Sequence, residues 1–247
     1  MNGYKKTLAL SKRNLKEILR DPLSVIFAFI MPEAMLILFY FAFHNLTSQF
    51  EMKYLCPGVI VFAQSFLTLF IGLLISGDRD GSYITRLYVS GAKASEFIAG
   101  YALAVYPIAA IQSILIFLTG AVIDSGIFSV YMLLGFVFSM LSATLFIGFG
   151  MLFGSLFGVK SVGGASSVVI TGQSILSGMW FPTEGLPAGF TAFMKAFPFK
   201  NATSLVTGAI DGFNFADGFT LPFFMVIGYT FAVVLLAVLA FKKQMRK

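Results

Sequence analysis

The sequence predicts an all-α integral membrane protein. We expect six transmembrane helices, an N-terminal amphipathic interface helix, and short re-entrant outer helices between spans five and six. Three observations predict this fold: an apolar composition, six long apolar runs, and basic residues gathered on one side of those runs. Of the 247 residues, 58% are hydrophobic and only 11% are charged, whereas a soluble domain carries about 25% charged residues. One water-soluble core could not bury so much apolar surface.

The apolar runs fit a bilayer in length. A helix rises about 1.5 Å per residue, so about 20 residues cross a hydrocarbon layer about 30 Å thick. The expected spans are 23–43, 57–77, 97–123, 127–159, 161–181 and 219–241. We therefore divide the chain into a cytoplasmic interface helix at 1–22 and a single six-helix transmembrane domain at 23–247.

The basic residues indicate the orientation. Residues 1–22, 77–96, Lys160 and the tail from Lys242 together hold 14 of the 17 Lys and Arg residues. Lys53, Lys195 and Lys200 fall on the other side. By the positive-inside rule both termini are cytoplasmic. We expect a multi-pass protein of the cell (plasma) membrane, in bacteria the inner or cytoplasmic membrane.

Residues 4–20 show a helical pattern before the first span. One face of the helix is apolar and the opposite face is basic. The apolar face holds Tyr4, Leu8, Leu15, Ile18 and Leu19, and the basic face holds Lys5, Lys6, Lys12, Arg13, Lys16 and Arg20. The pattern predicts a helix in the cytoplasmic headgroup layer, which Asp21-Pro22 ends. A simple basic anchor is the alternative.

The segment after the second span, 78–96, is the longest internal cytoplasmic piece. It begins Asp-Arg-Asp-Gly-Ser-Tyr-Ile-Thr-Arg-Leu-Tyr-Val-Ser-Gly. A plain connection would not need Tyr83 and Leu87, whose apolar surface favours a protein partner. The segment is therefore expected to be a docking element, and the alternative is packing on its own chain or on headgroups.

Few polar groups interrupt the spans. Glu33 lies about ten residues inside the first span, where a carboxylate is costly and should face protein or a hydrated path. A path-lining role and a structural role both remain open for it. Gly150, Gly154 and Gly158 recur at every fourth residue and predict close helix packing.

The fifth span carries a second stripe of small residues, which either lines a path or fits helices together. It consists of Gly163, Ser167, Thr171, Ser174 and Gly178, with Gln173 beside it.

The outer segment 182–218 joins spans five and six and is not plainly hydrophilic. Apolar side chains and three prolines alternate along it, at Pro182, Leu186, Pro187, Phe190, Phe193, Met194, Phe197, Pro198 and Phe199. This pattern predicts short helices that partly dip into the membrane, shielded there by protein or water.

Several classes of function lack their chemistry in this sequence. No Gly-rich phosphate loop ending in Gly-Lys-Ser/Thr is present, so the chain cannot hydrolyse ATP by that mechanism. His44 and Cys56 are the only residues of their types, which disfavours a Ser-His protease and a clustered metal site. A secondary transporter or a channel is a stronger alternative, although Glu33 alone is a thin basis for an ion site.

Two motifs resemble the membrane subunit of type-2 ATP-binding-cassette exporters. The segment Asp78-Arg79-Asp80-Gly81 through Arg86-Leu87 is similar to the family pattern acidic-x-acidic-Gly-Thr-x-x-x-Arg-Leu, with Ser82 in place of Thr. Ser90-Gly91 stands where the family has Thr-Pro, and Gly100-Tyr101 stands where the family has a later Gly-Lys. The series Trp180-Phe181-Pro182, Leu186-Pro187 and Phe197-Pro198 resembles the Phe-Pro, Leu-Pro and aromatic-Pro series after the fifth span. The resemblance covers nearly the whole chain.

This resemblance implies a complex of two membrane subunits, identical or paralogous, with two separate ATPase subunits that bind ATP and Mg. The membrane chain itself binds no cofactor. The implied site residues fall into three groups: ATPase coupling at Asp78, Asp80, Gly81, Tyr83, Arg86 and Leu87; a path at Glu33, Gln64, Thr171 and Gln173; and an outer gate at Phe181, Pro182, Leu186, Pro187, Phe197 and Pro198. The apolar lining favours export of a drug, antibiotic or membrane-active peptide, and a polysaccharide or lipid-linked substrate is the alternative.

Overall fold

Helices account for the secondary structure of the residues that this computed structural model describes, which are 3–89, 93–127, 129–181, 183, 185–212 and 219–244. The α-helices are α1 (Gly3–Arg20), α2 (Pro22–Val25), α3 (Met31–Phe43), α4 (Met52–Ser65), α5 (Leu67–Asp80), α6 (Tyr83–Val89), α7 (Ala94–Ile123), α8 (Val130–Leu156), α9 (Val159–Leu176), α10 (Ala188–Ala196), α11 (Pro198–Ile210) and α12 (Thr220–Gln244). Short turns of other helix types lie at Ile26–Ile30, Ser48–Phe50 and Ser125–Ile127.

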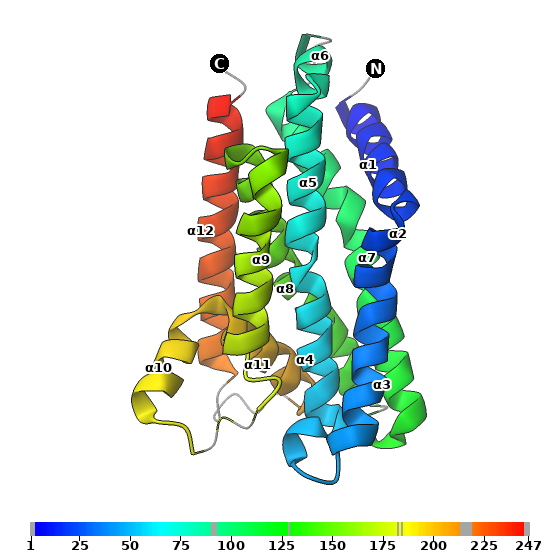
Figure 1. The fold of residues 1–247 in the computed structure, drawn as a ribbon, viewed down its shortest axis with the longest axis vertical. Coiled ribbons are helices and arrows are strands. Elements are labelled where there is room, and N and C mark those ends of the chain that lie inside the picture. Colours follow the sequence, from blue (N-terminus) through cyan, green and yellow to red (C-terminus); the bar gives the residue numbers. More distant parts are fainter. Residues whose placement is uncertain are drawn as a thin grey trace.

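Five helical segments in the described part are long and apolar enough to cross a membrane. They are Pro22–Phe43, Met52–Asp80, Ala94–Ile123, Val130–Leu156 and Thr220–Lys243. The remaining expected span, the fifth at 161–181, corresponds to α9, which has 18 residues and would extend about 27 Å. It runs along α5 within the bundle (Figure 1). An all-helical membrane fold is therefore supported, and the crossing of the membrane by α9 stays a prediction.

Two of the differences between the expected and observed span boundaries bear on the candidate site. The second span covers Met52–Asp80 rather than 57–77, so Asp78 and Asp80 belong to the last turns of α5 and not to a loop. The expected fifth span, α9, ends at Leu176 rather than at 181, because Gly178 adopts φ +72° and turns the chain away from the helix axis. The outer segment does contain short helices, α10 and α11, and their entry into a membrane stays a prediction.

The second span occupies the middle of the bundle and is almost wholly buried, whereas few residues of the first and last spans are buried. It packs closely on α8 because α8 carries glycines at the contact. A Cβ on Gly150 would lie 2.8 Å from the Thr68 carbonyl oxygen, and one on Gly154 would lie 2.7 Å from Cβ of Ile75. The packing role predicted for these two glycines is confirmed. Gly158 instead precedes the first turn of α9.

The first span contains a π-helical turn at Ile26–Ile30, directly before Pro32. Proline has no N–H, so the carbonyl of Ala28 loses its usual partner four residues later. The side chain of Gln112 on α7 donates to that carbonyl at 2.9 Å. A buried amide from a neighbouring span thus satisfies the backbone group that Pro32 leaves free.

Helix α1 divides its surface into three faces. Leu10, Ser11, Asn14 and Ile18 are buried, and α1 packs along α7, where a Cβ on Gly100 would lie 2.7 Å from Leu10. Tyr4, Leu8 and Leu19 stay exposed, next to the basic face. The amphipathic helix is confirmed, and the exposed apolar stripe suits the headgroup layer that the sequence predicts for it.

Candidate functional site

Three consecutive charged residues, Asp78, Arg79 and Asp80, end α5 at the end of the bundle where α1 begins and α12 finishes (Figure 1). Each of the three contacts a different neighbouring part of the chain. Asp78 reaches α1 and α7, Arg79 reaches the end of α8, and Asp80 reaches the start of α9. The triplet therefore joins the second span to four other helices.

Asp78 is the most buried of the three, with 6% of its surface exposed. It accepts a short hydrogen bond from the guanidinium of Arg13 and a second from the Tyr101 hydroxyl at 2.7 Å. The Arg13 guanidinium also lies 4.6 Å from the centre of the Tyr83 ring. We call Arg13, Asp78, Tyr83 and Tyr101 the Asp78 cluster. It brings together α1, α5, α6 and α7.

The electrostatics of the cluster favour a charged Arg13. Partial burial works against the guanidinium charge, but the hydrogen bond and the charge of Asp78 outweigh it and raise the pKa of Arg13. Glu17 adds a second carboxylate 2.8 Å from Arg13, one helical turn further along α1. The position of α1 on the bundle is therefore held by an ion pair as well as by apolar packing.

Arg79 and Asp80 bind the connection between α8 and α9. The Arg79 guanidinium donates to the carbonyls of Gly154, Ser155 and Phe157 at 3.1, 2.8 and 2.8 Å. These carbonyls lie at the C-terminal end of α8, where a cation is favourable. Asp80 accepts from the backbone N–H of Val159, the first residue of α9, at 3.3 Å.

Helix α6 is the short helix of the expected docking element. Its side chains face two ways: Ile84 is buried and Tyr83 half-buried, whereas Arg86 is exposed and makes a 3.4 Å contact with the Gly81 carbonyl. Leu87 belongs to α6, but its side chain is outside the described part, as is Ser90-Gly91. The expected docking element thus has an inner side on the Asp78 cluster and an outer side at Gly81 and Arg86. The prediction that Asp78 belongs to the docking surface is corrected. Helix α5 extends further than expected, and Asp78 is buried among this chain's own helices.

The four expected path residues do not come together. Glu33 is half-buried and lies against Thr119 of α7, with Oε1 unpaired among the described residues. Gln64 is fully buried and donates to Ser113 of α7 at 3.2 Å, which in turn contacts Ser139 of α8 at 3.0 Å. Both side chains are used within this chain's own helix packing.

The other two path residues lie on opposite faces of α9. Gln173 is fully buried and donates to Thr203 of α11 at 3.0 Å, whereas Thr171 is exposed. The exposed face of α9 also carries Ser167, Val168 and Ile175. Of the four expected path residues, Thr171 is exposed, Glu33 is half-buried and the two glutamines are buried.

Aromatic rings close the opposite end of the bundle. The centre of the Trp180 ring lies 4.6 Å from the centre of the Phe39 ring and 5.9 Å from that of Phe62. The Trp180 indole N–H donates to the Ser174 hydroxyl at 2.8 Å. Phe50 stacks on Phe39 at 6.0 Å. This aromatic cluster joins the first span, the second span and the segment that leaves α9.

The expected gate residues surround α10 and α11. Phe181 and Leu186 are half-buried, Pro187 precedes α10, and Pro198 is the buried first residue of α11 after Phe197. Proline suits a first helical position, since its missing N–H would have no partner there. Pro182 is outside the described residues. The structure brings these residues to one end, and their action as a gate stays a prediction.

Several residues of these contacts were not singled out by the sequence. Arg13 is one of six basic residues on α1, and nothing in the helical pattern separates it from the others. Tyr101 differs from the lysine of the family pattern, and that departure is the one sequence signal that points to it. Gln112 lies within an apolar span, where any amide should have a buried partner.

The described residues contain no group of three or more His, Cys, Asp or Glu side chains that could hold a metal ion.

Comparison with known proteins gives the family. No curated protein matches the sequence significantly. The family model described as ABC-2 type transporter matches residues 5–210, which includes most of α1, the Asp78 cluster and the whole of α11. Members of this family are the membrane components of ABC transporters and work with an ATP-binding subunit. The chain belongs to the ABC-2 type transporter family and is a membrane subunit of an ABC transporter.

Proposed function

We propose that this subunit exports a hydrophobic or amphipathic cargo, such as a drug, an antibiotic or a membrane-active peptide, with energy from a separate ATPase. The observation that carries the proposal is the Asp78 cluster, which links the exposed helix α6 to three other helices. In the complete complex, two ATPase subunits holding ATP and Mg bind two membrane subunits. Both termini then lie in the cytoplasm, and α6 faces the ATPase.

The coupling role follows from the two sides of α6. Gly81 and Arg86 are exposed for a partner, while Tyr83 lies against Arg13. A push on α6 therefore moves the Tyr83 ring, and through Arg13 and Asp78 it reaches α1 and the second span. Because Arg79 and Asp80 bind the α8–α9 connection, the same movement extends to α9.

The path is proposed along the exposed faces of the first span and α9. Ile37, Leu38 and Phe41 of the first span are exposed, as are Val168 and Ile175 of α9. Thr171 adds a weakly polar group between the last two. Such a surface suits an amphipathic cargo between this chain and a second membrane subunit. Gln64, Gln173 and Glu33 then serve chiefly to hold helices together.

A polysaccharide or lipid-linked cargo is the second candidate. A hydroxyl-rich pocket beside α11, lined by Thr203, Ser204 and Thr207 among others, favours it. A wide, mostly apolar exposed face on two helices favours the first candidate.

The test is transport in reconstituted vesicles. The chain is purified with the ATPase that accompanies it, placed in liposomes, and assayed for ATP-dependent movement of a lipophilic dye and of an amphipathic peptide. We expect movement that stops when the ATPase carries an inactive phosphate loop. Movement that continues with the inactive ATPase would contradict the proposal, and movement of a labelled oligosaccharide alone would favour the second candidate.

A further inference from the structure

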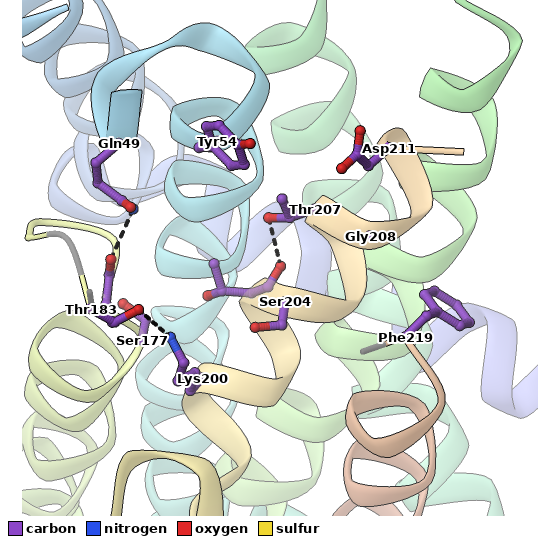
Figure 2. A pocket seen from close by; sticks show the side chains of 12 residues that line it. Gln49, Tyr54, Ser177, Thr183, Lys200, Ser204, Thr207, Gly208, Asp211 and Phe219 are labelled. Atoms are coloured by element: carbon purple, nitrogen blue, oxygen red, sulfur yellow. Dashed lines mark hydrogen bonds between the residues drawn. The ribbon is translucent and has the colours of Figure 1, made fainter. Parts of the chain in front are cut away.

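A polar pocket of about 430 Å³ opens at the end of the bundle opposite α6. Its volume falls within the range of about 300–1,000 Å³ that small-molecule sites occupy. Figure 2 shows side chains from the start of α4, the segment after α9, and α11 pointing toward one space. The wall is formed by Gln49, Tyr54, Ser177, Gly178, Thr183, Lys200, Thr203, Ser204, Thr207, Gly208, Asp211 and Phe219.

Lys200 is the cation of this pocket. Its ammonium group donates to the Thr183 hydroxyl at 3.4 Å, and among the described residues the ion pairs do not include it. An ammonium group has three donors, so a single long hydrogen bond leaves capacity for a ligand. Burial and the nearby charge of Lys195 lower the pKa of Lys200. An anion placed beside it would offset both effects.

Asp211 is the carboxylate that lines the same pocket, and it does not neutralise Lys200. Asp211 forms an ion pair with Lys53 at the first turn of α4. The remaining polar wall consists of hydroxyl and amide groups. The Thr203 hydroxyl accepts from Gln173, and the Thr207 hydroxyl donates to the Thr203 carbonyl. Ser204 also lines the pocket, beside Thr207 on α11 (Figure 2).

Gly178 keeps the space beside the ammonium group open. Its φ of +72° favours glycine, and a Cβ there would lie 3.4 Å from Nζ of Lys200 and 2.8 Å from Cγ2 of Thr183. Gln49 donates to the Gly178 carbonyl at 2.9 Å and holds this turn against the start of α4. The turn, the lysine and the hydroxyl groups thus line one concave surface.

We propose that this pocket binds an anionic phosphate group, with Lys200 as the charge partner and Thr183, Thr203 and Ser204 as hydroxyl donors. A phosphate offers several oxygens that can accept from one ammonium group and a set of hydroxyls at the same time. The group could belong to a lipid headgroup or to a water-soluble phosphate. This site goes beyond the transport role, because its binding can be measured without the ATPase and without export.

The experiment uses the purified full chain in two arms. In the first arm, inorganic phosphate is titrated at constant ionic strength and the midpoint of thermal unfolding is recorded, since a ligand that binds the folded state raises it. In the second arm, native mass spectrometry counts phosphatidylglycerol and phosphatidylcholine molecules retained from mixed micelles. Lys200→Met is compared with Lys195→Met, which removes the same charge from an exposed position nearby.

We expect Lys200→Met to weaken binding by about tenfold to a hundredfold, the range for loss of a hydrogen-bonded charge. Lys195→Met should bind nearly as the unchanged chain does. Stabilisation by phosphate alone would indicate a soluble ligand, and retention of phosphatidylglycerol alone would indicate a lipid. Ser204→Ala provides a milder variant should Lys200→Met fail to fold, and it should also weaken binding.

Three outcomes would overturn the proposal. The unchanged chain could bind neither probe, Lys200→Met could bind as tightly as Lys195→Met, or, with Lys200→Met unfolded, Ser204→Ala could leave binding unchanged.

Discussion

Replacing Asp78 by alanine should release α1 from the bundle. The substitution removes the acceptor of two donors, the Arg13 guanidinium and the Tyr101 hydroxyl. Tyr101 is fully buried, so its hydroxyl would lose its partner without access to water, at a cost of about 1–3 kcal/mol. Arg13 is 36% exposed and keeps Glu17 at 2.8 Å, so the free energy lost at Arg13 is smaller than for a fully buried ion pair. We take about 2 kcal/mol for the two losses together, which is roughly a thirtyfold change in the docking equilibrium of α1.

Hydrogen exchange measured in nanodiscs provides the assay. Amides of α1 in Asp78→Ala should exchange roughly thirtyfold faster, whereas amides in the middle of α8 should not change. Glu17→Gln is the control, because it removes a carboxylate from Arg13 at the exposed side only. A double variant, Arg13→Met with Asp78→Ala, should cost less than the sum of the single variants, because the two groups interact directly. Unchanged exchange of α1 in Asp78→Ala would show that the Asp78 contacts do not hold α1 on the bundle.

Three further predictions concern packing and the ends of helices. Gly154→Val should lower the midpoint of thermal unfolding sharply, because a Cβ at this position would already lie 2.7 Å from Cβ of Ile75. Gly164→Ala is the control and should not lower it, because no atom lies within 4 Å of a Cβ placed there. Equal midpoints for the two variants would contradict the close packing. Gln112→Leu should lower the free energy of unfolding in mixed micelles by about 1–3 kcal/mol, because the Ala28 carbonyl would be left unpaired; no change would show that water or another group replaces the amide. Arg79→Met should raise the hydrogen-exchange rate of amides at the α8–α9 connection, since three hydrogen bonds to carbonyls are lost. Arg86 lies on the exposed side of α6, so the control variant Arg86→Met should leave that connection protected.

The helices of this fold were predictable from the sequence because the bilayer sets a length and a composition for each span. The glycines at 150 and 154 were also predictable as packing positions, since a face without side chains has few other uses in an apolar helix. The ends of the helices were harder to predict from the sequence. Asp78 and Asp80 looked like loop residues, but their charges are satisfied by Arg13 and by the backbone of Val159, so the helix extends through them.

Tertiary contacts explain what the sequence could not separate. The sequence does not show which face of an apolar helix is buried. It therefore gave no reason to distinguish Gln64, Thr171 and Gln173 as path residues. The structure buries the two glutamines and exposes the threonine. Lys200 was predicted only as one of three basic residues on the outer side. Its place in a pocket depends on the turn at Gly178 and on α11, which come together only in the folded chain.

In the proposed function, movement passes from α6 to the spans through the Tyr83 ring, and Tyr83→Ala is the variant that tests this coupling. The substitution removes the ring beside Arg13 and leaves Gly81 and Arg86 exposed for the ATPase. Cargo movement and ATP hydrolysis are measured in the same proteoliposomes, with Tyr4→Ala, an exposed tyrosine of α1, as the control. We predict that Tyr83→Ala still binds its ATPase and supports hydrolysis but moves less cargo per ATP. An unchanged ratio of cargo to ATP in Tyr83→Ala would contradict the account.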